Sequence, residues 1–160
     1  MSHHRVRRLP VDRVLGLVLG LVLTGLSACA APATFTATDR STISNLLEQQ
    51  RAAWNRGDLD AFMAAYERSE QLIFTSSSQI RRGWQTTLDK YRARYGQDTS
   101  SMGKLAFEIL DLRPIGADAA VMLGKWQLTE TPQAGSGVFS LVFARTADGW
   151  RIVHDHTSAE

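Results

Sequence analysis

The change from helical to strand periodicity near residue 104 constrains the fold more than any other feature of this sequence. Beyond that point, four segments are apolar or alternate between apolar and polar residues, as strands do: 104–115, 119–131, 138–146 and 150–158. Short turn or loop sequences separate these segments, which predicts antiparallel neighbours joined by hairpins. A sheet of this kind must bury one of its faces against other elements of the chain.

Three amphipathic helices are predicted ahead of the strands, and they can provide that cover. Apolar residues return to one helical face in three segments: 41–54, 58–66 and 84–95. Gly57 suits the end of the first helix, and Asp58 suits the cap of the second. A brief strand at 72–74 and a polar loop at 75–78 follow the second helix. The sequence therefore predicts an α+β domain, with three N-terminal helices packed on a strongly curved, mainly antiparallel sheet and a pocket between the two layers.

The first 28 residues have the pattern of an export signal. Four arginines precede an uncharged run at 14–26, which is shorter than the roughly 20 apolar residues that span a bilayer. Removing this segment takes away four of the 18 basic and one of the 16 acidic residues, so the remainder carries a net charge of −1. A nucleic-acid partner would need a basic stripe, and none is expected here. The remaining chain has the length of one ordinary domain.

The four residues Leu26–Cys29 follow the apolar run and resemble the lipobox of bacterial lipoproteins. This resemblance implies cleavage before Cys29 and attachment of lipid to its thiol, which gives a stable membrane anchor when several acyl chains are present. Ala30 implies the outer membrane where an organism has two. We therefore predict an exported protein, lipid-anchored to the bacterial cell envelope, in three parts: a lipoprotein signal peptide at 1–28, a tether at 29–38 and a folded domain at 39–160.

The terminal segment WRIVHDHTS holds two histidines that are candidates for a functional site. Strict alternation along a strand places Ile152, His154 and His156 on one face and Asp155 on the other. A catalytic zinc site needs three protein ligands, whereas the two histidines supply two and the mature chain has no further histidine. We therefore expect neither a metal nor a cofactor.

Several features along the chain, taken together, resemble the nuclear transport factor 2-like superfamily and, within it, the SnoaL-like and uncharacterised bacterial branches. The matching features are Trp54–Asp60, Tyr66, Gly83, Tyr91 and the ending DGWRIVHDHTS. The resemblance covers about residues 40–158 and implies a cone-shaped domain that commonly dimerises through its sheet. The ending also resembles that of the association domain of calcium/calmodulin-dependent kinases, which assembles subunits and has no catalytic role. One fold with such varied functions does not by itself define an activity.

Ketosteroid isomerases of this superfamily carry a general-base aspartate on the strand after the second helix. By resemblance, that place falls near Phe74, between Ile73 and Thr75, where this sequence has no carboxylate. A proton cannot be abstracted without a base within reach. Isomerase chemistry of that kind is therefore not expected.

We predict a lipid-anchored envelope protein whose cone-shaped domain binds a small, largely apolar molecule or a protein partner and carries no catalytic set. The candidate ligand-binding residues are Trp54, Tyr66, Phe74, Trp126 and His156. The alternative is an isomerase, dehydratase or cyclase, in which His154 or His156 is the general acid or base and Tyr66 a hydrogen-bond donor. A third interpretation is a purely structural dimerisation module, and we expect a homodimer.

Overall fold

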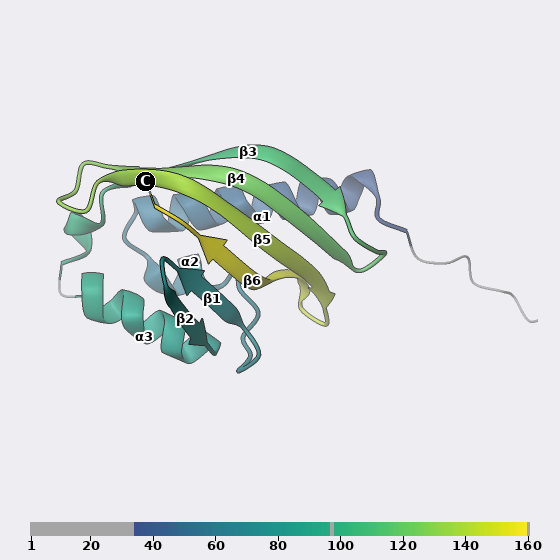
Figure 1. Ribbon diagram of the computed structural model, residues 1–160, viewed down its shortest axis with the longest axis horizontal. Coiled ribbons are helices and arrows are strands. Elements are labelled where there is room, and N and C mark those ends of the chain that lie inside the picture. The colour runs from purple at the N-terminus through teal and green to yellow at the C-terminus, as the bar shows by residue number, and fades with distance from the viewer. Residues whose placement is uncertain (1–33, 97, 160) are drawn as a thin grey trace, which may run out of the picture. The chain divides into compact units, whose positions relative to one another are not determined.

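The computed structural model describes residues 34–96 and 98–159, so the predicted signal peptide, Cys29 and part of the predicted tether lie outside the described residues. Within them the chain forms α-helices, a 3₁₀ turn and strands (Figure 1). The helical elements are α1 Ala37–Asn55, α2 Leu59–Met63, α3 Trp84–Tyr95 and the 3₁₀ turn η1 Thr99–Met102. The strands are β1 Ile73–Ser76, β2 Gln79–Arg82, β3 Lys104–Pro114, β4 Ala119–Thr129, β5 Gly135–Thr146 and β6 Gly149–Thr157.

The strands form one curled, six-stranded sheet in the order β2-β1-β6-β5-β4-β3 (Figure 1). Strands β3 to β6 are neighbours in chain order and pair antiparallel, as the sequence predicts. β1 instead pairs in parallel with β6, which brings the segment after α2 beside the end of the chain. The predicted α+β fold, with helices packed on a mainly antiparallel sheet, is confirmed.

Helix α1 begins at Ala37, four residues earlier than predicted, because a capping box closes its first turn. Thr36 Oγ1 accepts a hydrogen bond from the Asp39 N–H at 3.2 Å, and Asp39 Oδ2 accepts one from the Thr36 N–H at 2.9 Å. Asp39 Oδ1 accepts from Trp150 Nε1 at 3.0 Å and pairs with Arg145 at 2.8 Å. The Trp150 bond foremost, and then those from Thr36, hold the pKa of Asp39 far below its usual value. The start of α1 is thereby attached to β6.

A β-bulge in β6 shifts the phase of its side chains. Residues 142 and 143 of β5 face His154 and Ile152, so Val153 is an extra residue without a partner in the register. Ile152 before the bulge and Asp155 after it are both buried, although they are three positions apart along the strand. The prediction that strict alternation continues through this segment was wrong from Val153 onward.

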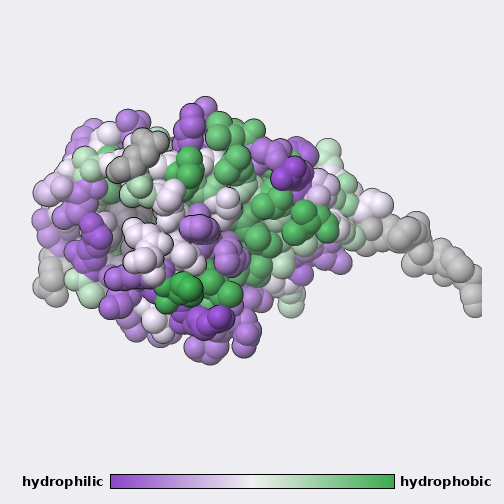
Figure 2. Space-filling model, viewed as in Figure 1, coloured by the Kyte–Doolittle hydropathy of each residue, from purple (hydrophilic) through white to green (hydrophobic). Residues whose placement is uncertain are grey.

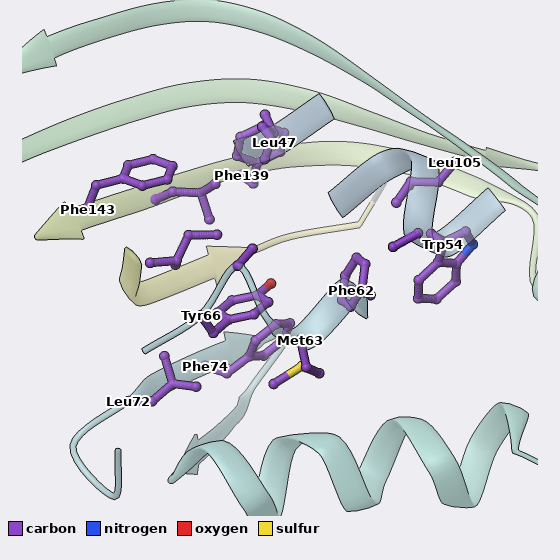
Figure 3. Packing of buried hydrophobic residues seen from close by; sticks show 14 of the residues in the cluster. Leu47, Trp54, Phe62, Met63, Tyr66, Leu72, Phe74, Leu105, Phe139 and Phe143 are labelled. Carbon is purple, nitrogen blue, oxygen red and sulfur yellow. The ribbon is translucent and has the colours of Figure 1, made fainter. Parts of the chain in front are cut away.

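The core fills the space between the inner face of the sheet and the helices (Figure 3). Among its labelled members are Leu47 of α1, Met63 of α2, and Phe139 and Phe143 of β5. The indole N–H of Trp84 donates to the carbonyl oxygen of Met63 at 2.8 Å. The indole N–H of Trp54 donates to the carbonyl oxygen of Met102 at 3.1 Å. Both buried indoles therefore have their polar group satisfied.

Strand β2 was not predicted, because the segment 75–78 was assigned to a loop and the following residues to no element. β1 extends to Ser76, and a two-residue turn leads to Gln79, its antiparallel partner. Ile80 is 68% exposed, so β2 lacks the alternating burial that reveals a strand in a sequence. Among the described residues, no helix is both long and apolar enough to cross a bilayer.

Candidate functional site

A cavity of about 440 Å³ lies between the sheet and the helices, within the size range of small-molecule sites. Aromatic rings form a large part of its walls, and the rings that line it are Trp54, Phe62, Tyr66, Phe74, Tyr91, Tyr95, Phe107, Trp126 and Phe139. The Phe62 ring centroid lies 5.1 Å from that of Trp54 and 5.3 Å from that of Tyr91, in edge-to-face contacts. Figure 3 shows Phe62, Tyr66 and Phe74 close together on one side of this space. Such walls suit a flat, apolar ligand.

Asp155 contributes a buried carboxylate to the cavity wall and is the only acidic residue among the described residues that line it. The Tyr66 hydroxyl donates to its Oδ2 at 2.7 Å, and the Thr157 hydroxyl donates to its Oδ1 at 2.8 Å. Asp155 is only 4% exposed. Burial raises the pKa of Asp155 to about 6, against the opposing effect of the two hydrogen bonds. A carboxyl group with this pKa can take up and release a proton near neutral pH.

Tyr66 is held beside Asp155 by backbone hydrogen bonds to the part of β6 that precedes the bulge. The Ile152 N–H donates to the carbonyl oxygen of Ala65, and the Glu67 N–H donates to that of Ile152, both at 2.9 Å. Burial first, and then the negative charge of Asp155, raise the pKa of the Tyr66 hydroxyl well above its ordinary value. The hydroxyl therefore keeps its proton and acts as a hydrogen-bond donor.

The parallel pairing of β1 with β6 changes one conclusion drawn from the sequence. Phe74 marks the place where ketosteroid isomerases carry their base, and β1 has no carboxylate there. In the register of the sheet, however, Phe74 lies opposite Asp155 of β6. β1 itself has no carboxylate at this place, as the sequence shows, but the neighbouring strand brings Asp155 opposite it.

Three basic side chains also line the cavity: Arg81 of β2, and Lys90 and Arg94 of α3. None of them makes an ion pair with a carboxylate of the described residues. The guanidinium carbon of Arg81 lies 5.3 Å from the centroid of the Phe74 ring. Its Nε is buried and has no hydrogen-bond partner within the part of the chain that the structure describes. A buried donor left unpaired costs about 1–3 kcal/mol.

The structure brings together four of the five predicted ligand-binding residues: Trp54, Tyr66, Phe74 and Trp126 all line the cavity. His156 is exposed and His154 is half-buried, and neither lines the cavity. The bulge at Val153 explains this, because it turns Asp155 inward in place of its two neighbours. No three His, Cys, Asp or Glu side chains among the described residues are grouped so that they could hold a metal ion.

Sequence reasoning missed Asp155 and Arg81. The signal for Asp155 was partial: an acid in an apolar strand is unusual, but its face depends on a bulge that the strand's residues do not reveal. Arg81 gave no signal, because it belongs to a short strand between exposed residues. Lys90 and Arg94 are four positions apart on one helix face, yet they could be placed at the cavity only once α3 was seen beside β2.

Several solved structures of nuclear transport factor 2-like proteins share this curled sheet with its helices. An NTF-2 like protein of unknown function from Shewanella oneidensis MR-1 is 39% identical, with a TM-score of 0.71 over 74% of this chain and 98% of that one. A nuclear transport factor 2-like superfamily protein from Salmonella enterica serovar Typhimurium LT2 is 21% identical, with a TM-score of 0.64 over 78% and 93%. A putative calcium/calmodulin-dependent protein kinase type II association domain from Thiobacillus denitrificans is 20% identical, with a TM-score of 0.60 over 81% and 99%. The last two likenesses concern the fold alone.

The sequence narrows this class further. The chain belongs to the SnoaL-like domain family, whose model matches residues 43–160. No curated protein matches it in sequence. Because relatives with this fold serve very different purposes, the function has to be argued from the cavity itself.

Proposed function

We propose that this protein binds a small, largely apolar molecule in the cavity between its sheet and its helices. The observation that carries the proposal is the cavity itself, which has the volume of a small-molecule site and a wall that includes nine aromatic rings. A purely structural domain would gain more from filling this space with side chains, since close packing stabilises an interior. A few polar groups, notably Asp155 and Arg81, supply the orienting contacts that such sites use.

A second candidate function, a proton-transfer enzyme, is favoured by one specific observation. Asp155 has a pKa of about 6 and a buried hydrogen-bond donor, Tyr66, at 2.7 Å. A general acid or base works best when its pKa lies near the working pH. Asp155 would then take the role that the sequence suggested for His154 or His156, and Tyr66 would keep its role as donor.

Protein purified from its own host is expected to retain a small molecule, detectable by native mass spectrometry as a mass that is lost when the protein is denatured. Ala134 lines the cavity and is exposed, so Ala134→Trp should narrow the opening without disturbing the core, and it should lower the retained fraction severalfold. Ala147→Trp is the matched control, because Ala147 is also exposed but does not line the cavity. Equal retention in the two variants would contradict binding in this cavity.

The same preparation separates the two candidate functions. If Asp155 transfers protons, the released compound should exchange hydrogen with deuterated water in the presence of the protein, and Asp155→Asn should stop that exchange. A binding protein would leave the compound unlabelled. Both results can be followed by mass spectrometry of the released compound.

We propose in addition that two copies of the chain associate through the outer face of the sheet. Leu123 of β4 and Val138 of β5 are each 42% exposed there, and Figure 2 shows apolar patches on the face of the sheet turned to the viewer. Apolar surface of this kind is stabilised by burial against a partner. The native mass spectrum reports the oligomeric state, and a monomer at micromolar concentration would contradict a homodimer.

We also propose that Cys29 anchors the protein to the cell envelope, on the basis of the lipobox-like segment Leu26–Cys29 and the apolar run before it. Wild-type protein is expected in the membrane fraction and should incorporate labelled palmitate. Cys29→Ala should move the protein out of that fraction and abolish the label. Ser27→Ala, which alters a neighbouring small residue and keeps the thiol, is the control. Persistence of Cys29→Ala in the membrane fraction would remove the basis for a lipid anchor.

A further inference from the structure

The cavity combines aromatic walls with an unbalanced set of charges. Arg81, Lys90 and Arg94 carry three positive charges, and Asp155 carries the only negative one among the described lining residues. The two elements that carry these cations, β2 and α3, lie next to each other (Figure 1). Asp155 lies on β6, with β1 between it and β2. The positive charges are therefore gathered toward one wall.

Arg81 is the most buried of these cations and the least satisfied. Lys90 and Arg94 are exposed and can be solvated, whereas Arg81 is half-buried. Its side chain makes one hydrogen bond within the described chain, a long contact from Nη2 to Gln79 Oε1 at 3.4 Å. Its Nε is buried and has no partner among the described residues, so the protein itself holds this guanidinium only weakly. An oxyanion is the natural partner, because a guanidinium donates two parallel hydrogen bonds to a carboxylate.

The basic side chains of the cavity disfavour a cationic ligand. Aromatic walls can also attract a cation through their ring faces. Here the guanidinium of Arg81 already lies over Phe74, and that of Arg94 lies 5.4 Å from the centroid of Tyr95. A cationic ligand would have to approach these like charges in a partly desolvated space.

We infer that the ligand of this cavity is an aromatic carboxylate, with its ring system between the aromatic walls and its carboxylate on Arg81. This inference rests on the proposed small-molecule binding and narrows it to one chemical class. Lys90 and Arg94 raise the local concentration of the anion at the opening without needing to contact it. Asp155 and Tyr66 line the same cavity and can hydrogen-bond a further hydroxyl or carbonyl group of the ligand.

Two isosteric probes test this assignment on the full chain by isothermal titration calorimetry at pH 7.5. 2-Naphthoate is an anion at this pH, and 2-naphthamide has nearly the same shape without a charge. 2-Naphthoate is expected to bind at least about tenfold more tightly, as one charge-assisted hydrogen-bonding site provides. Equal affinity of the two probes would overturn the inference and leave small-molecule binding standing. Failure of both probes to bind would overturn the assignment of the ligand class. Small-molecule binding as such is tested separately, by the compound retained in protein purified from its host.

Arg81→Met tests which residue holds the carboxylate, because it keeps an apolar stem over Phe74 and removes the charge. We expect it to reduce the affinity for 2-naphthoate at least about tenfold and to leave that for 2-naphthamide unchanged. Arg82→Met is the matched control: the neighbouring residue is exposed and does not line the cavity. Equal losses in the two variants, or an equal loss for both probes in Arg81→Met, would overturn the assignment to Arg81. The comparison of probes on the wild-type chain needs no variant and remains decisive if Arg81→Met fails to fold.

Discussion

Trp54→Ala is expected to lower the free energy of unfolding by about 3–5 kcal/mol, as removal of a buried tryptophan side chain usually does. Trp54 is 5% exposed and, from α1, contacts residues of α2, α3 and η1. Its ring lies 5.1 Å from Phe62 and 5.2 Å from Tyr95, centroid to centroid, so the substitution removes contacts to two helices at once. Since small domains are stable by only about 5–15 kcal/mol in total, urea unfolding should show a large shift of the midpoint.

Trp126 provides the matched control for this substitution. It also lines the cavity and its indole N–H also donates to a carbonyl oxygen, that of Ser158 at 2.9 Å, but it is only partly buried. Trp126→Ala should therefore cost about half as much as Trp54→Ala or less. Trp54→Phe removes the hydrogen bond from the indole N–H to the Met102 carbonyl oxygen but keeps an aromatic ring in place. Loss of the hydrogen bond should lower the free energy of unfolding by about 1 kcal/mol, and the smaller ring should lower it further. Similar losses for the two alanine variants would mean that burial at Trp54 does not determine its contribution.

Stability should also depend on pH through Asp155, in the opposite direction to an ordinary surface carboxylate. Its pKa is raised from 3.8 to about 6 by burial, so the folded state binds a proton more readily than the unfolded state does. The resulting stabilisation is fully present below pH 3.8 and is lost as the pH rises through 6. Relative to Asp155→Asn, the wild-type chain should gain about 2 kcal/mol of unfolding free energy between pH 8 and pH 4.5. Urea titrations of both proteins across this range measure the difference.

Asp58 gives this experiment a control with the opposite sign. Its side chain caps α2 by accepting from the Ala61 N–H at 2.9 Å, and this hydrogen bond lowers the pKa of Asp58. The advantage of the wild-type chain over Asp58→Asn should therefore decrease as the pH falls toward the pKa of the carboxyl group. If the Asp155→Asn difference also moved in that direction, Asp155 would not be a buried carboxylate with a raised pKa.

The parts of the fold that could be predicted are those in which burial repeats at a regular spacing. The helix ending near Trp54 buries every third or fourth residue, and β4 and β5 bury alternate residues, and all three were recognised in the sequence. The aromatic members of the site followed from the same logic, since large apolar residues such as Phe74 line whatever space the two layers enclose. The helix start at Ala37 was missed because it depends on a capping box contributed by Thr36 and Asp39.

The polar members of the site could not be predicted because each depends on pairing between distant segments. Asp155 faces the cavity because of one unpaired residue in β6, and it meets Phe74 because β1 joins that strand in parallel. Arg81 reaches the cavity from a strand of four residues whose own pattern shows no buried face. These features arise from strand register, which a single sequence leaves open when neither strand has a clear alternation.

The bulge at Val153 also makes the sequence His154-Asp155-His156 ambiguous in a useful way. With the extra residue before them, these three residues direct the Asp155 carboxylate into the cavity. Without it, the two-residue repeat of a strand would direct the imidazoles of His154 and His156 inward instead. A single codon gained or lost at this point would therefore exchange one chemistry for the other, while the hairpin and its hydrogen bonds persist. Members of the family that share this ending are best compared by the length of the segment between Trp150 and Asp155, before the identity of its residues is considered.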